Sequence, residues 1–153
     1  MNTFYYSSPV GILEIKSTDD HITQLLFKDS AGTSSETITQ VMKECISQLD
    51  EYFSGSRQNF SLPLALEGTH FQQSVWKALQ TIPYGQTISY KQLAEKVGNP
   101  KACRAVGNAN GKNPIAIIIP CHRVIAGDNS LGGYSGGLDT KTTLLRLEGD
   151  ARF

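Results

Sequence analysis

The dipeptide Cys121-His122 is the part of this 153-residue sequence whose residue types could do covalent chemistry. A cysteine attacks as its thiolate, and a nearby imidazole can accept the thiol proton directly or through a water molecule. The pair follows the run 115–119, which is rich in β-branched residues and typical of a buried strand or extended segment. The alternative is a buried structural thiol beside an unrelated histidine, and a Cys-His pair without context favours that alternative.

The residues that follow the pair favour a reactive cysteine. A glycine-rich stretch, 127–137, contains Tyr134-Ser135-Gly136-Gly137 and can form a pocket whose backbone approaches a flat ligand, with the tyrosine as an aromatic wall. A last helix is predicted at about 139–148 and ends with Glu148. A carboxylate there could orient the histidine and complete a relay of Cys121, His122 and Glu148.

The elements that must position these residues divide the chain in two. Three short runs rich in β-branched and aromatic residues predict strands at 4–6, 10–16 and 22–27, and apolar periodicity predicts a helix at about 36–54 that ends at Gly55. Cys45 lies on the buried face of that helix, and 56–68 is typical of an extended connector. We predict an α+β fold, with an N-terminal domain of a small β-sheet plus a helix (1–67) and a mostly helical C-terminal domain (68–153).

The C-terminal half contains a candidate helix-turn-helix. Thr69 with Gln72, and Ser89 with Gln92, have capping-box spacing, and Pro100 is placed to open a second helix at about 100–109. The side chains of that helix are small, so its backbone can approach a surface closely, with Arg104 projecting from it. The alternative is a tightly packed internal helix with Arg104 in a surface salt bridge.

Charge is distributed unevenly although the net charge is +0. Residues 1–68 hold four Lys/Arg against nine Asp/Glu, whereas residues 69–153 hold ten against five. A basic half facing a polyanion explains this, and a solvated helix face is the alternative. Three widely spaced cysteines form no disulfide framework and no CxxC metal knuckle, and no signal peptide or membrane-spanning run is present. We therefore expect a cytoplasmic protein.

Six groups of residues together resemble one family. They are SPVG (8–11), YFSGSRQNFSLPL (52–64), GTHFQQSVWKAL (68–79), IPYGQTISYKQLA (82–94), GNPKACRAVGNANGKNP (98–114), and PCHRVI (120–125) with the later GGYSGG and LEG. The chain resembles the O6-alkylguanine-DNA alkyltransferases, also called methylated-DNA–protein-cysteine methyltransferases, over nearly its whole length. The resemblance implies direct-reversal DNA repair, in which each molecule irreversibly transfers one alkyl group from O6-alkylguanine to Cys121 without a cofactor. O4-alkylthymine is an open second substrate.

The resemblance also implies a role for each matching residue. Cys121 accepts the alkyl group, His122 takes its proton, Glu148 holds the histidine, Asn113 orders the neighbouring turn, and Tyr90 donates a hydrogen bond to the guanine. The residues implied in DNA binding are Arg104, which fills the place of the flipped nucleotide, and Ala102, Ala105, Gly107, Ser89 and Lys91. Tyr134, Ser135 and Gly136 line the substrate pocket.

The expected partner is double-stranded DNA that contains O6-alkylguanine, bound through its minor groove by a monomeric protein with no membrane association. Some family members bind zinc in the N-terminal domain, but here that domain has only His21 and Cys45, so we expect no metal. Cys103 is an open but weaker candidate for a second reactive thiol.

Two other functions compete with this interpretation. A sequence-specific DNA-binding regulator would use 89–109 in the major groove and would not need Cys121. A cysteine hydrolase would need an oxyanion hole that the sequence does not reveal, and adjacent Cys and His side chains point apart on an extended chain.

Overall fold

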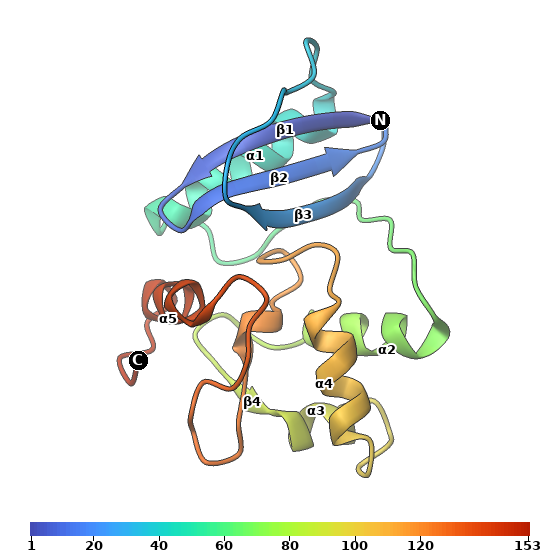
Figure 1. Cartoon of the computed structure of the whole chain (residues 1–153), viewed down its shortest axis with the longest axis vertical. Helices are drawn as coiled ribbons and strands as arrows, with labels where there is room; N and C mark the ends of the chain where they lie inside the picture. Colours follow the sequence, from blue (N-terminus) through green and yellow to red (C-terminus); the bar gives the residue numbers. More distant parts are fainter. The chain divides into compact units, whose positions relative to one another are not determined.

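The computed structural model describes residues 1–153, which separate into two compact units, Met1–Leu66 and Glu67–Phe153 (Figure 1). The first unit contains a three-stranded sheet and one long helix, and the second contains four helices and two very short strands. The α+β prediction is confirmed. None of the helices has both the length and the apolar character that crossing a membrane requires.

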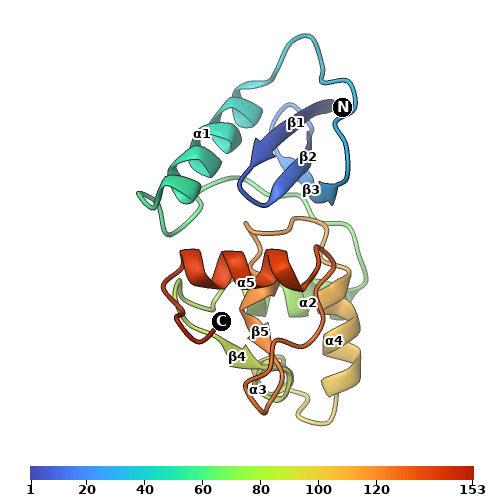
Figure 2. The ribbon, with the colours of Figure 1, turned by 60° about the vertical axis from the view of Figure 1, so that its left-hand side comes forward.

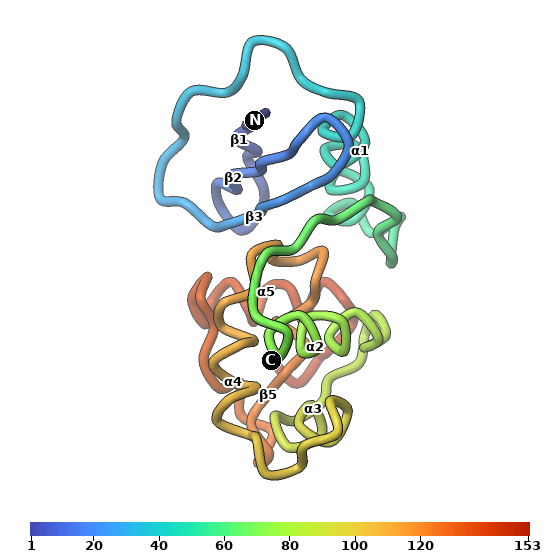
Figure 3. The backbone as a smooth tube through the Cα atoms, turned by 90° about the vertical axis from the view of Figure 1, so that its right-hand side faces the viewer, coloured from blue at the N-terminus to red at the C-terminus, as the bar shows by residue number.

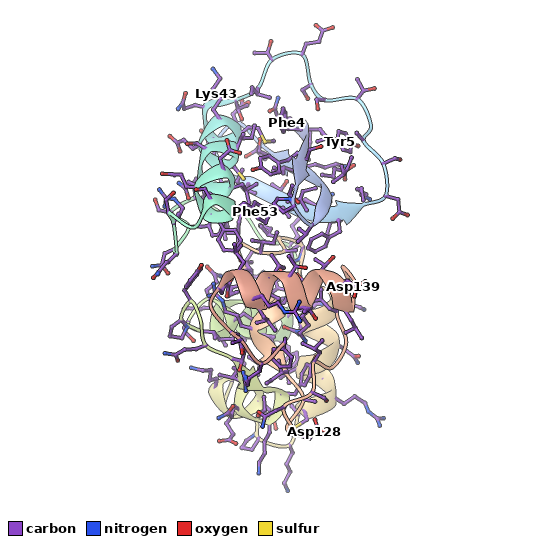
Figure 4. The ribbon with its side chains drawn as sticks, turned by 90° about the vertical axis from the view of Figure 1, so that its left-hand side faces the viewer. Phe4, Tyr5, Lys43, Phe53, Asp128 and Asp139 are labelled. Atoms are coloured by element: carbon purple, nitrogen blue, oxygen red, sulfur yellow. The ribbon has the colours of Figure 1, made fainter.

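The sheet of the first unit is antiparallel in the order β1-β2-β3, with β1 Asn2–Ser8, β2 Gly11–Ser17 and β3 Ile22–Lys28. Alternate side chains point to opposite faces of a strand, so Phe4, its partner Ile15 and Leu25 share one face of the sheet. Helix α1, Gln40–Ser54, covers that face (Figure 2). Figure 4 shows Phe4 on the α1 side of β1 and Tyr5 on the other side.

The ends of α1 follow from its flanking residues. The Thr39 hydroxyl accepts a hydrogen bond from the Met42 amide, and Gly55 ends the helix in the left-handed conformation at φ 86°. The prediction that the helix begins near residue 36 is wrong, because the Asn2 side chain bonds the carbonyl of Thr37 and the amide of Thr39 and holds that segment beside β1. Cys45 is fully buried on the packed face of α1, as expected.

The helices of the second unit are α2, His70–Leu79; α3, Tyr90–Lys96; α4, Cys103–Gly111; and α5, Leu138–Leu147. Figure 3 follows the chain through α2 and α3 to α4, which packs against both. The indole nitrogen of Trp76 on α2 donates a hydrogen bond to the carbonyl of Ala109 on α4 at 2.9 Å. Strands β4, Ile88–Ser89, and β5, Val124–Ile125, pair in parallel, so the start of α3 lies beside the chain that follows Cys121.

The helix pair differs from the prediction at one boundary. The capping boxes of α2 and α3 are both present as predicted. The second helix of the pair begins at Cys103 instead of Pro100, because the Ala102 amide bonds the carbonyl of Asn99 at 3.0 Å and closes a turn first. Proline fixes φ but leaves ψ free, and it therefore suits a turn as well as the first position of a helix.

The run Ile115–Ile119 is buried, but it is a tight turn instead of the predicted extended segment. The amide of Ile119 bonds the carbonyl of Ile115 at 3.0 Å, and Ile117 has a φ of 71°, which is rare for a β-branched residue and costs about 1–3 kcal/mol. The Asn113 carboxamide spans the turn, accepting from the Ile115 amide at 3.0 Å and donating to the Ile119 carbonyl at 2.7 Å. These contacts bend the chain just before Cys121.

Candidate active site

Cys121 and His122 begin a 3-10 turn, Cys121–Arg123, and are 2% and 0% exposed. The amide of Arg123 closes this turn on the carbonyl of Pro120 at 3.0 Å. The expectation that the two side chains diverge on an extended chain therefore does not apply to this segment. The turn holds the thiol and the imidazole inside the second unit on a rigid backbone.

A buried carboxylate connects His122 with Arg123. Glu148 is the residue that ends α5, and its Oε2 atom is 2.7 Å from Nε2 of His122. Its Oε1 atom accepts a hydrogen bond from Nε of Arg123 at 2.7 Å. Arg123 also donates to the carbonyl of Ile82 at 2.7 Å and lies over the Tyr84 ring. Burial alone would raise the pKa of Glu148, but hydrogen bonds and charge from His122 and Arg123 outweigh it and lower the pKa to about 2. Glu148 is thus a carboxylate at neutral pH.

The ionised carboxylate sets the tautomer of His122. Since Glu148 can only accept, Nε2 carries the proton and Nδ1 is left with its lone pair. Nδ1 is buried and has no hydrogen-bond partner within the protein. Burial lowers the pKa of His122 despite the opposing effect of Glu148, so the ring is neutral near pH 7 and can act as a base through Nδ1.

The sulfur of Cys121 has both an unfavourable and a favourable environment for its thiolate. Burial raises the pKa of the thiol, whereas hydrogen bonds from the Asn113 and Tyr134 side chains and the positive charge of Lys141 act in the opposite direction. In the resting protein Cys121 is therefore a protonated thiol. The groups around it stabilise the negative charge that forms when the proton leaves.

A cavity of about 270 Å³ opens onto Cys121. Its wall includes four of the residues predicted for catalysis or for the pocket, namely Cys121, Tyr90, Tyr134 and Ser135. Gly136, which was also predicted to line the pocket, is not part of the wall. Gly132 has a φ of +69°, and a Cβ there would lie 3.2 Å from the Tyr90 ring, so the glycine allows the loop to approach the tyrosine. The other lining residues are Gly107, Asn110, Gly111 and Gly133.

Two buried polar residues near the thiol were absent from the sequence-based set. Lys141, fully buried on α5, donates through Nζ to the carbonyls of Val124, Leu131 and Gly133, and lies 6.0 Å from the centre of the Tyr134 ring. It thereby ties the pocket loop to the chain that follows Cys121. Asn110, on the buried face of α4, donates to the carbonyl of Cys121 at 3.4 Å. A lysine in the first turn of an amphipathic helix gives no sequence signal for burial.

The residues expected to contact DNA lie on or near α3 and α4. Arg104, Ala105 and Lys91 are exposed, whereas Ala102 and Gly107 are partly buried. Ser89 caps α3, its hydroxyl accepting from the Gln92 amide at 3.1 Å. The exposure of Arg104 and Ala105 leaves this side of α4 accessible, which does not fit a helix packed on every side.

The chain has no disulfide and no cluster of metal-ligating side chains. No group of three or more His, Cys, Asp or Glu side chains is placed to hold a metal ion. All three cysteines are free, with Cys45 and Cys121 buried and Cys103 exposed.

Two family profiles match the chain. Residues 1–66 match "6-O-methylguanine DNA methyltransferase, ribonuclease-like domain", and residues 70–150 match "6-O-methylguanine DNA methyltransferase, DNA binding domain". The catalytic candidates and the cavity all lie within the second match.

Curated relatives and solved structures agree with these profiles. A protein of Mycolicibacterium paratuberculosis named methylated-DNA–protein-cysteine methyltransferase is 48% identical over 145 residues, which cover 92% of this chain and 88% of that protein. A protein of the same name from Methanosarcina acetivorans is 45% identical, covering 94% and 96%. The crystal structure of Mycobacterium tuberculosis OGT in complex with DNA superposes with a TM-score of 0.88 at 44% identity, covering 97% of this chain and 92% of that one.

Proposed function

The chain belongs to the 6-O-methylguanine DNA methyltransferase family, and from this premise we propose that it repairs DNA by moving an alkyl group from O6 of guanine to Cys121. The observation that carries this proposal is the placement of Cys121 on a cavity and next to a histidine that Glu148 holds in its basic tautomer. We further propose that residues 68–153 form the domain that performs both DNA binding and alkyl transfer.

The reaction is an in-line displacement at the alkyl carbon. The thiol proton moves to His122 Nδ1, directly or through one water molecule, and Sγ attacks the carbon. The S–C bond forms while the bond between carbon and O6 breaks, and its electron pair leaves with the guanine. Proton transfer to N1 then restores neutral guanine, so the thiol has lost one proton and the base has gained one. Tyr90, on the cavity wall, donates a hydrogen bond to the leaving base.

Glu148 and Arg123 act through the histidine. Arg123 supplies two hydrogen bonds to the carboxylate, at 2.7 and 3.1 Å, and so keeps Glu148 ionised. The carboxylate then stabilises the imidazolium that forms when His122 takes the proton, without accepting that proton itself. Asn113, Tyr134 and Lys141 stabilise the transient thiolate.

DNA binds through α3 and α4, with α4 in the minor groove, where the partly buried Ala102 and Gly107 and the exposed Ala105 allow close approach of the backbone. The alkylated base lies inside the duplex and must be rotated out, at a cost of about a few kcal/mol. The exposed Arg104 then occupies the gap left in the base stack. Ser89 and Lys91, at the start of α3, contact the DNA backbone. The protein acts as a monomer.

The product is a thioether on Cys121, which has no route back to a thiol in this site, so one protein molecule repairs one lesion. We also propose a cytoplasmic location, because a reducing compartment keeps a free acceptor thiol such as that of Cys121 reduced.

Intact mass spectrometry after mixing with DNA that contains O6-methylguanine tests the function. We expect the mass of one methyl group per chain, located on Cys121 by peptide mapping, and no addition in Cys121→Ala. Cys103→Ala is the matched control because its thiol is exposed but outside the cavity, and it should react normally. An unmodified Cys121, or many lesions repaired per molecule, would contradict the proposal.

The role of Arg104 can be tested separately. We expect Arg104→Ala to slow repair of duplex DNA about 10-fold or more while leaving the reaction with free O6-benzylguanine nearly unchanged, since only the duplex requires extrusion of the base. The measurement is the second-order rate of Cys121 alkylation with each substrate. Equal losses on both substrates would refute this role.

A further inference from the structure

The turn at 82–85 packs against the end of α5, next to Glu148. Its Gly85 has a φ of +81°, and a Cβ at that position would lie 3.0 Å from the carbonyl oxygen of Glu148. The glycine therefore allows a close approach of two backbone segments that a larger residue would separate. Tyr84, the preceding residue, is partly buried and is not part of the cavity wall. Any effect of its side chain on the chemistry must therefore pass through other residues.

The hydroxyl group of Tyr84 holds the last turn of α5. The final carbonyl groups of a helix have no partner within the helix, and helix ends fray. Tyr84 donates a hydrogen bond to one of these carbonyls, that of Leu147, at 3.1 Å. Burial and the charge of Glu148 raise the pKa of Tyr84, so its hydroxyl keeps its proton at neutral pH. Since Glu148 directly follows Leu147, this hydrogen bond limits the movement of the carboxylate.

The ring of Tyr84 covers the cation that pairs with the same carboxylate. The guanidinium carbon of Arg123 lies 5.7 Å from the ring centre, within the range of a cation–π contact. The guanidinium also donates to the carbonyl of Ile82 at 2.7 Å and to both carboxylate oxygens of Glu148. The turn at 82–85 therefore holds Arg123 through a backbone carbonyl and through an aromatic ring. Because Arg123 is only 6% exposed, water screens its pairing with Glu148 very little.

Resting on the proposed function, we propose that Tyr84 is a positioning residue for alkyl transfer, which keeps the carboxylate of Glu148 against His122. It does so by holding the end of α5 and the guanidinium of Arg123 at the same time. His122 becomes positively charged when it takes the thiol proton, and Glu148 stabilises that charge. Loss of the Tyr84 side chain frees the end of α5 and admits water beside the ion pair, so the imidazolium is stabilised less.

The first test compares Tyr84→Leu, which removes the ring and the hydroxyl, with Tyr84→Phe, which removes only the hydroxyl. The readouts are the rate of Cys121 methylation at saturating O6-methylguanine DNA, and the dissociation constant for that DNA measured in a Cys121→Ala background. We expect Tyr84→Leu to methylate about 10-fold more slowly with a dissociation constant within about 2-fold of wild type, and Tyr84→Phe to lose about 3-fold or less. Thr81→Val is the matched control, because it removes a hydroxyl that donates to the Ala78 carbonyl at the end of α2, and it should react at the wild-type rate.

The decisive measurement repeats the substitution in a protein that lacks the carboxylate. In a Glu148→Gln background, Tyr84→Leu should change the methylation rate by less than about 2-fold, because the contact that Tyr84 supports is already lost. If Glu148→Gln does not fold, His122→Asn provides the equivalent background, and if Tyr84→Leu does not fold, Tyr84→Phe carries the same comparison with a smaller factor. The same loss in both backgrounds, or a variant that binds DNA more weakly but methylates at the wild-type rate, would overturn the proposal. Failure of the proposed function is distinguishable, because wild-type Cys121 would then gain no methyl group and this inference would fall with it.

Discussion

Each unit of the molecule contains one glutamate that is largely removed from water, and the two are used differently. Glu14, on β2, accepts from the Tyr5 hydroxyl at 2.5 Å and from Gln24 at 2.8 Å, with Lys16 and Lys28 at 3.9 and 4.0 Å. Glu148 accepts from Arg123 and from His122. The side chain of Glu14 is 10% exposed and that of Glu148 is 1% exposed. Both carboxyls have a lowered pKa, the first mainly because of Tyr5 and the second because His122 and Arg123 outweigh burial.

The difference lies in what their partners can still do. Tyr5 and Gln24 are side chains on neighbouring strands, so the Glu14 cluster only ties β1, β2 and β3 together. His122 retains an unpaired ring nitrogen, and Cys121 beside it opens onto a cavity. Buried polar groups that are fully paired stabilise a fold, whereas unpaired atoms kept beside a cavity indicate chemistry.

Of the substitutions that test the difference between Glu14 and Glu148, Glu148→Gln should have the largest effect on both stability and alkyl transfer. This substitution leaves the 6%-exposed Arg123 without its charge partner, so we expect the free energy of unfolding to fall by about 3–5 kcal/mol. Alkyl transfer should slow by about 100-fold or more because His122 loses the carboxylate that stabilises its protonated form. Urea denaturation measures the first effect and the rate of Cys121 methylation the second. A variant as stable and as fast as the wild type would show that the two glutamates do not differ.

Acid should weaken the second unit through the same carboxylate. The folded-state pKa of Glu148 is lowered to about 2 from an ordinary 4.5, so its stabilisation is fully present above pH 4.5 and is lost as the pH falls towards 2. The free energy of unfolding should decrease over this range by up to about 3 kcal/mol, and Glu148→Gln should remove most of the decrease. Urea titrations at several pH values measure it. If the free energy of unfolding of Glu148→Gln fell with decreasing pH as steeply as that of the wild type, other groups would be responsible for the acid sensitivity.

Lys141 tests whether the pocket loop depends on a buried cation. Burial lowers its pKa to about 8, so the ammonium is mostly charged at pH 7. In Lys141→Met the carbonyls of Val124 and Gly133 lose their donor and Cys121 loses a positive neighbour, so we expect alkyl transfer to slow about 10-fold at pH 7. The pH–rate profile should move to higher pH, because the pKa of the Cys121 thiol rises when the positive charge is removed. A purely structural loss would lower the rate without moving the profile along the pH axis. Lys141→Arg, which keeps the charge, should shift the profile less.

The parts of the fold that follow from local pattern could be predicted from the sequence. Runs rich in β-branched and aromatic residues predicted the three strands, and capping-box spacing at Thr69 and Ser89 predicted two helix starts. The pattern failed at 115–119, where hydrogen bonds from the Asn113 side chain to the backbone of Ile115 and Ile119 hold an apparent strand in a turn. The pairing of His122 with Glu148 was foreseen from the motif and the family resemblance.

The rest of the site could not be predicted, because burial of a polar residue depends on partners far along the chain. From the sequence, Lys141 would be expected to face the solvent in the first turn of a helix. In the folded chain its ammonium group instead contacts the carbonyls of Val124, Leu131 and Gly133. Asn110 reads as one of several polar residues on α4, and its place in the wall depends on how α4 packs. The roles of the site residues stay predictions until their variants are measured.

The smallest effect should come from Glu14→Gln, which completes the comparison. Glutamine keeps an oxygen to accept from Tyr5, and the ion pairs that it removes involve lysines that are 36% and 42% exposed, so water already screens them. We expect the free energy of unfolding to fall by at most about 1 kcal/mol, and the rate of Cys121 methylation to stay within about 2-fold of wild type. The same urea and methylation assays apply. A loss of methylation comparable to that of Glu148→Gln would mean that the N-terminal sheet contributes to the chemistry, and the division into one structural and one catalytic carboxylate would fail.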